Sequence, residues 1–178
     1  LTELHKVENG KIIDRFSTFV NPEIPIPFRI EKLTSINDEM VIDAPKIEEI
    51  LPKFMEFCKD SVMVAHNSDF DMSFIEANCK RQDLECDFTV IDTVAMSRYL
   101  IIGLGRYKLD NVAKALGIVL DHHHRAVDDA ECTALIFLKL CKMLEGKGID
   151  NLDELNRQGK QSKNLIDKLP AHHAIILV

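Results

Sequence analysis

Residues 61–71, with the sequence SVMVAHNSDFD, decide the fold. The run 61–65 is short and continuously apolar, which is typical of a buried central strand. It leads into His66 and Asn67, and a helix is expected over residues 70–81. A second strand is expected at 89–91, directly before Asp92. Binding sites in layered α/β sheets gather at the carboxyl ends of strands, so Asp71 and Asp92 are expected at one sheet edge.

The rest of the chain alternates strand-like and helix-like patterns. Asn9-Gly10 predicts a β-hairpin with a type I′ turn over residues 4–20. Asp43 is expected as a helix N-cap, and Pro52 is expected to kink or break the helix that follows. Further helices are expected over residues 29–33, 94–100, 109–116 and 128–144. The pattern predicts an α/β fold with a mixed sheet flanked by helices.

The sequence changes character after residue 148. Two short polar helical stretches are followed by Pro170 and an apolar strand over residues 174–178. We expect one domain over residues 1–148, followed over residues 149–178 by a linker and the start of a second domain. The strand over residues 174–178 has no expected pairing partner in the first domain, so we expect it to belong to the second. Leu1 lies in a strand-like pattern, so the chain is expected to be a piece of a larger protein.

Composition limits the possible classes of protein. The 178 residues carry a formal net charge of −7, which argues against non-specific binding of duplex DNA by this domain alone. No apolar run approaches the roughly 20 residues of a membrane span, and no signal peptide is seen, so no membrane partner is expected. The five cysteines form no Cys-x-x-Cys pair, which indicates reduced thiols in a cytoplasmic protein.

A second motif, His124-Arg125-Ala126-Val127-Asp128-Asp129, complements Asp71. Carboxylates and one histidine are the groups needed to hold divalent metals and to deprotonate a water for phosphodiester cleavage. The spacing from His124 favours Asp129 as the ligand and predicts that Asp128 is exposed.

Each motif also has a plain structural explanation. Asp71 is explained equally well as a helix N-cap, and Asp129 as an acid that complements a helix dipole. A three-histidine metal site over residues 122–124 ranks low, because adjacent residues do not readily converge on one metal. The two motifs together, on an alternating α/β background, favour the catalytic interpretation.

These residues resemble the DEDDh exonucleases, an RNase H-like family, and within it the proofreading exonuclease domain of PolC-type bacterial DNA polymerase III. The similar segments are residues 10–16, 64–67, 90–93, 123–126, 152–156 and 173–178. The resemblance also implies that the domain beginning within residues 149–178 is PHP-like. The resemblance implies that Asp71 and Asp129 support Mg²⁺ or Mn²⁺, two ions in the complete site. It also implies that His124 is the general base. Asn67 and Phe70 would shape the pocket for the terminal nucleotide, and Asp92 would have a supporting role at most.

Two positions depart from the family pattern. The family's first motif is an Asp-x-Glu on its first strand, and no such pair precedes the hairpin here. Without it the chain itself is expected to be inactive. Ser35 stands where the family often has Gly, near the expected 3′ terminus.

The resemblance implies a two-metal 3′→5′ exonuclease that releases nucleoside monophosphates from a single-stranded or frayed DNA 3′ end. Its partner would be the rest of a replicative polymerase chain, in the cytoplasm. Two alternatives stay open: an exonuclease attached to a DinG-type helicase or trimming RNA, and a non-catalytic module that binds DNA or a polymerase.

Overall fold

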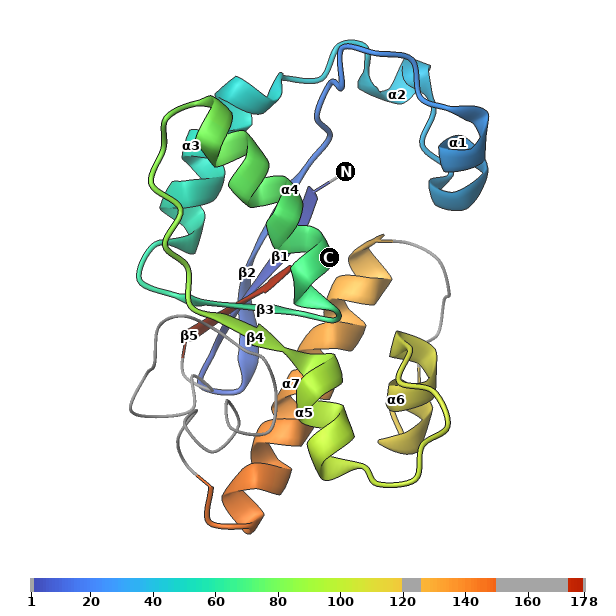
Figure 1. Cartoon of the computed structure of the whole chain (residues 1–178), viewed down its shortest axis with the longest axis vertical. Coiled ribbons are helices and arrows are strands. Elements are labelled where there is room, and N and C mark those ends of the chain that lie inside the picture. The colour runs from blue at the N-terminus through green and yellow to red at the C-terminus, as the bar shows by residue number, and fades with distance from the viewer. Residues whose placement is uncertain (1, 120–125, 150–172, 178) are drawn as a thin grey trace.

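The computed structural model describes residues 2–119, 126–149 and 173–177. A mixed five-stranded sheet with the order β2-β1-β5-β3-β4 lies between two groups of helices (Figure 1). The strands are β1 (Thr2–Glu8), β2 (Lys11–Thr18), β3 (Val62–Ala65), β4 (Val90–Asp92) and β5 (His173–Leu177). The predicted α/β architecture is confirmed.

The first two strands form the predicted hairpin. Asn9 and Gly10 have φ angles of 51° and 77°, which is the pair of positive values that a type I′ turn requires. The ladder between β1 and β2 is antiparallel, with one irregularity between Lys6 and Val7.

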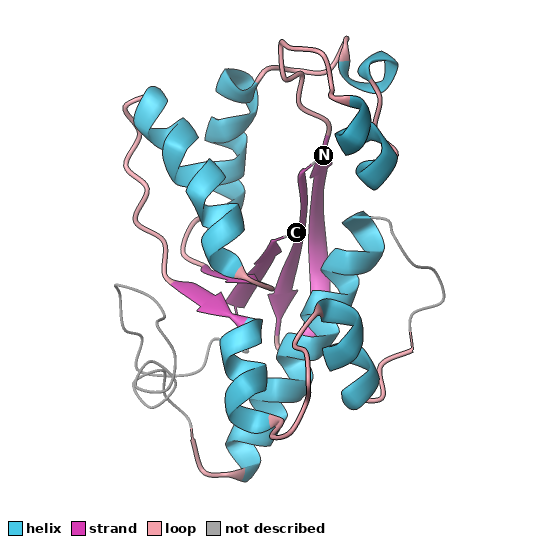
Figure 2. Ribbon diagram, turned by 45° about the vertical axis from the view of Figure 1, so that its right-hand side comes forward, coloured by secondary structure: helices cyan, strands magenta, loops and turns pink. Residues whose placement is uncertain are grey.

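The helices are α1 (Phe28–Thr34), α2 (Asp38–Val41), α3 (Ile47–Cys58), α4 (Ser68–Arg81), α5 (Thr93–Leu100), α6 (Leu109–Ala115) and α7 (Ala126–Gly146). All of them except α1 and α2 cover the two faces of the sheet, as Figure 2 also shows. Val62 and Val64 pack in the core under α5, α6 and α7, while Met63 and Ala65 pack in the core under α3 and α4. This alternation explains why the whole run is apolar. In the described ranges, no helix combines the length and apolarity needed to cross a membrane.

The third helix differs from its prediction at two points. It begins at Ile47 rather than near Asp43, because the Glu49 side chain accepts a hydrogen bond from the Lys46 N–H at 3.0 Å and so caps the later start. The helix also continues through Pro52 without the expected break. The Pro52 side chain is exposed, while Leu51 and Phe54 beside it are buried and hold the helix on the sheet.

The expectation of an unpaired C-terminal strand is wrong. β5 lies in the centre of the sheet, antiparallel to β1 and parallel to β3. Buried Ile176 joins the core under α7, so its apolar sequence is explained by burial within this sheet. The division at residue 148 and the assignment of the tail to a following domain stay predictions. The helices expected in the tail lie outside the described residues.

Ser35 adopts the conformation that glycine would take most easily. It ends α1 with φ 58° and ψ 19°, in the left-handed region. A residue with a Cβ atom is strained there by roughly 1–2 kcal/mol. The local backbone therefore keeps a shape suited to Gly although the residue is Ser.

Candidate active site

The junction between β3 and α4 is an unusual backbone feature. Asn67 has φ 75° and ψ 55°, and it stands at the N-cap of α4. Its N–H donates a hydrogen bond to Asp92 Oδ1 at 2.9 Å, which holds this left-handed residue in place. Asp71 is therefore not the N-cap. It is in the first turn, where the open N–H groups of the helix favour a carboxylate.

Asp92 connects two helix starts. The same Oδ1 atom also accepts a hydrogen bond from the Val94 N–H at 2.9 Å and caps α5. One carboxylate oxygen thus fixes the beginnings of α4 and α5 relative to each other. This geometry gives Asp92 a structural part in building the sheet edge.

His66 adds a third connection at this edge. Its Nε2 lies 3.0 Å from the carbonyl oxygen of Tyr107, and its Nδ1 lies 2.8 Å from Thr93 Oγ1. A carbonyl only accepts, so Nε2 carries the proton and Nδ1 is an acceptor for the Thr93 hydroxyl, which also lies 3.2 Å from the Ala65 carbonyl oxygen. Burial lowers the pKa of His66, although the Tyr107 carbonyl and the charge of Asp92 oppose this. The neutral ring therefore links Thr93 and the Tyr107 carbonyl through two hydrogen bonds.

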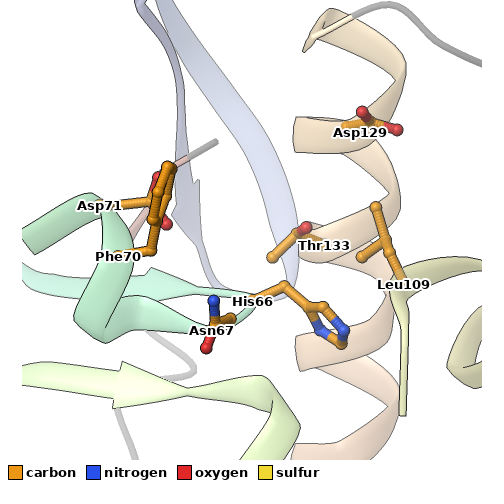
Figure 3. A pocket seen from close by; sticks show the side chains of 7 residues that line it. All are labelled: His66, Asn67, Phe70, Asp71, Leu109, Asp129 and Thr133. Atoms are coloured by element: carbon orange, nitrogen blue, oxygen red, sulfur yellow. The ribbon is translucent and has the colours of Figure 1, made fainter. Parts of the chain in front are cut away.

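A cavity of about 190 Å³ opens above this edge (Figure 3). Its lining residues are His66, Asn67, Phe70, Asp71, Leu109, Asp129 and Thr133. Asp71 comes from α4 and Asp129 from α7, so two carboxylates from different helices line one space. The structure thus brings together four of the residues singled out in the sequence. Their roles stay predictions, and His122, His123 and His124 lie outside the described residues.

The environment of Asp71 disfavours its charge. Burial, together with the nearby negative charge of Asp92, raises the pKa of Asp71 to about 6, although a hydrogen bond from its own backbone acts in the opposite direction. A cation beside this carboxylate would stabilise its ionised form and so lower its pKa.

The two neighbouring acids of α7 differ in position. Asp129 lines the cavity and Asp128 does not. The expectation that Asp128 is exposed is wrong. It is half-buried, and its Oδ2 atom is buried without a hydrogen-bond partner among the described residues.

Thr133 is a cavity residue that the sequence analysis missed. It lies one helical turn after Asp129, and its side chain is fully buried. Its Oγ1 has no hydrogen-bond partner in the part of the chain that the structure describes. The four-residue spacing from Asp129 was a signal for it, because such residues share a helix face. Leu109, also missed, carried no comparable signal.

The oxygen donors of the cavity suit a hard divalent cation. Mg²⁺ is typically held by one or two carboxylates and completes its shell with water and phosphate oxygens. Asp71 and Asp129 meet that minimum. Within the described ranges no cluster of three or more acidic, histidine or cysteine side chains that could hold a metal ion is found.

A mixed sheet with carboxylates from α4 and α7 lining one cavity at its edge is an arrangement that suits a metal-dependent α/β nuclease. Residues 3–137 match the RNase T-type family described as Exonuclease, and the chain belongs to this family. The resemblance drawn from the motifs is confirmed. Members of this family in general use divalent metal ions.

Similar proteins agree with this assignment. The chain is 49% identical over 173 residues to the DNA polymerase III PolC-type of Caldanaerobacter subterraneus subsp. tengcongensis and 48% identical over 174 residues to that of Clostridium perfringens. These matches cover 97% of the chain and 12% of each relative. The chain is thus homologous to the exonuclease part of these polymerases and spans about an eighth of their length.

Solved structures show the same fold. Exonuclease X in complex with 5′ overhanging duplex DNA is similar with a TM-score of 0.58 and 29% identity, and 80% of each chain is covered. The nuclease domain of 3′hExo, a DEDDh family member bound to rAMP, gives a TM-score of 0.62 at 20% identity. That match covers 89% of this chain and 79% of the other. The predicted RNase H-like fold is confirmed.

Proposed function

We propose that the chain is the proofreading 3′→5′ exonuclease domain of a PolC-type DNA polymerase III. It hydrolyses the terminal phosphodiester of a DNA strand and releases a nucleoside monophosphate. The observation that carries the proposal is the cavity that Asp71 and Asp129 both line, in a chain 49% identical to such a polymerase.

Each cavity residue has a distinct part in this proposal. Asp71 and Asp129 hold Mg²⁺ or Mn²⁺, which supplies charge stabilisation at the attacking and leaving oxygens. Asn67 and Phe70 contact the terminal nucleotide, since both line the cavity beside Asp71. His124 takes the proton of the attacking water. The complete site would hold two ions, and the second depends on acidic residues beyond these two carboxylates.

The proposed activity implies a DNA substrate, a polymerase partner and a cytoplasmic location. The substrate is a single-stranded or frayed DNA 3′ end in the cytoplasm. The net charge of −7 gives this domain little attraction for DNA backbone. The remainder of the polymerase chain would therefore deliver the primer end to the cavity.

Metal binding tests the ligand assignment. Asp129→Asn removes a ligand charge and is expected to lower Mn²⁺ affinity at least about tenfold, because affinity for hard cations depends on the number and charge of the ligands. Asp128→Asn is the matched control: it changes the same charge at the neighbouring position, outside the cavity lining. Isothermal calorimetry with Mn²⁺ compares the two variants. Equal losses would contradict the assignment of Asp129.

Cleavage tests the activity. Release of nucleoside monophosphate from a primer end is measured for this chain and for a version extended by about 20–30 residues encoded upstream, enough for one more strand. We expect metal-dependent release from the extended version and very little from the chain alone. In the extended version, His124→Ala should slow single-turnover cleavage about 10²–10⁴-fold while metal binding is retained. A rate within threefold of the parent would exclude His124 as the base, and a matching RNA primer distinguishes the RNA-trimming alternative.

A further inference from the structure

Two exposed phenylalanines form a pair beside the cavity. Phe70 and Phe74 are 61% and 58% exposed, although aromatic side chains of this size are usually buried. Their ring centroids lie 5.1 Å apart with an interplanar angle of 73°. Phe70 lines the cavity next to Asp71 (Figure 3), whereas Phe74 lies one helical turn further along α4, outside the lining. The pair thus extends the apolar surface of the cavity along the helix.

The same face of α4 continues towards basic residues. Asn78 and Arg81 follow Phe74 at spacings of four and seven, which places all of them on one side of the helix. Lys80 and Arg81 form the basic last turn of α4. The face therefore runs from the cavity over two aromatic rings to positive charge.

We propose that Phe74 is a second base-stacking position, which takes the penultimate base of a nucleic-acid strand whose terminal nucleotide lies in the cavity. The inference rests on the proposed function and names a specificity determinant of that site. In this arrangement a single-stranded 3′ end lies along α4, and the nucleic-acid backbone runs from the cavity towards Arg81.

The helix geometry selects unstacked bases. The ring centroids of Phe70 and Phe74 lie 5.1 Å apart, and the rings are inclined at 73° to each other. Bases in a duplex strand follow one another at about 3.4 Å. Two bases that each contact their own ring must therefore be separated further than in a duplex. Such a site accepts a frayed or single-stranded end and disfavours a paired one.

The charge of the domain also favours stacking. With a net charge of −7, binding cannot depend on a broad positive surface. Aromatic stacking adds roughly five- to hundredfold in affinity per base and requires no particular base sequence. A nuclease that removes any terminal nucleotide needs a contact of this kind.

Nucleotides of increasing length test the inference. Thymidine 5′-monophosphate, the dinucleotide pTpT, and the same dinucleotide lacking its 5′ base are titrated into this chain in EDTA, which prevents metal-dependent hydrolysis. Binding is followed by ¹H–¹⁵N NMR. We expect pTpT to bind at least about fivefold more tightly than the monophosphate, and the dinucleotide without its 5′ base to lose that gain.

The variants separate stacking from simple apolar contact. Phe74→Leu keeps an apolar side chain but removes the flat ring, and it should abolish the gain from the second base while leaving monophosphate binding unchanged. Phe70→Ala should weaken binding of both ligands. Ile102→Ala is the matched surface control, because Ile102 is 92% exposed and does not line the cavity.

Each outcome is decisive. An undiminished gain for pTpT in Phe74→Leu, with intact monophosphate binding, would overturn the inference and leave the proposed function standing. The monophosphate has no internucleotide bond to cleave, so its titration is repeated in Mg²⁺. If it produces no shifts at Asn67 and Phe70 there, the proposed function fails, and the second stacking position fails with it.

Discussion

The two walls of the cavity are built on different principles. The wall at the ends of β3 and β4 is held by hydrogen bonds: Asp92 accepts from two backbone N–H groups, and His66 connects to Thr93 and Tyr107. The wall formed by α7 is held by apolar packing, with Phe137, Leu140 and Leu144 fully buried.

The polar atoms of the α7 wall differ from those of the other wall. Thr133 Oγ1, which lines the cavity, is buried without a hydrogen-bond partner among the described residues. The polar groups of the first wall thus have hydrogen-bond partners within the protein, whereas the Thr133 hydroxyl of the second wall has none among the described residues. Removal of a hydrogen-bonding group from the first wall should therefore lower stability, and removal of the Thr133 hydroxyl should not.

The largest effect on stability is expected from Asp92→Ala. It leaves the N–H groups of Asn67 and Val94 without their acceptor and removes the cap of α5. Loss of a cap costs about 1 kcal/mol, and charge-assisted hydrogen bonds contribute roughly 1.5–3 kcal/mol. We expect the free energy of unfolding to fall by about 2–3 kcal/mol in urea titrations.

Asp69→Ala is the matched control for Asp92→Ala. Asp69 is an exposed acid in the first turn of α4, so its removal should cost under about 0.5 kcal/mol. Equal losses for the two variants would show that Asp92 does not hold the wall together.

An intermediate, pH-dependent effect is expected from Asp71→Asn. The folded pKa of Asp71 is about 6, above its ordinary value of 3.8. Its contribution to stability is thus fully present below pH 3.8 and is lost as the pH rises through 6. The full shift corresponds to about 3 kcal/mol, but solvent screening of this partly exposed side chain reduces it to about 1 kcal/mol.

In metal-free buffer, Asp71→Asn should therefore match the wild type at pH 4 and exceed its stability by about 1 kcal/mol at pH 7.5. Added Mg²⁺ should stabilise the wild type and not the variant. Chemical denaturation at the two pH values, with and without Mg²⁺, checks this. If the difference from the wild type does not change with pH, the environment assigned to Asp71 is wrong.

Local patterns predicted the elements of this fold but not its distant pairings. The apolar run at 61–65 and the Asn9-Gly10 turn depend on neighbouring residues, and both were predicted correctly. The central place of β5 depends on pairing with β1 and β3, more than 100 residues away.

The candidate site shows the same division. Asp71 and Asp129, which both line the cavity, were singled out because each lies within a local motif. The hydrogen bond from His66 to Tyr107 spans 41 residues, and no local pattern encodes it. Burial of Thr133 depends likewise on how α7 packs, and the sequence alone does not specify that packing.

The smallest effects come from one substitution made in both walls. Thr93 and Thr133 are both fully buried, but the Thr93 hydroxyl lies 2.8 Å from His66 Nδ1, whereas the Thr133 hydroxyl has no partner among the described residues. Replacement of Thr by Val keeps the shape and removes the hydroxyl. Thr93→Val should lower the free energy of unfolding by about 1 kcal/mol, because it removes the hydroxyl that hydrogen-bonds with His66 Nδ1 and the Ala65 carbonyl oxygen.

Thr133→Val should instead raise the free energy of unfolding by roughly 0.5 kcal/mol, because it removes a buried hydroxyl that gains no hydrogen bond on folding. Thermal and urea denaturation of both variants in metal-free buffer show whether each substitution raises or lowers the free energy of unfolding. Opposite signs would confirm that the two walls satisfy their polar groups differently. Destabilisation by Thr133→Val as large as that by Thr93→Val would mean that the α7 wall is complete without a ligand, and the comparison between the walls would fail.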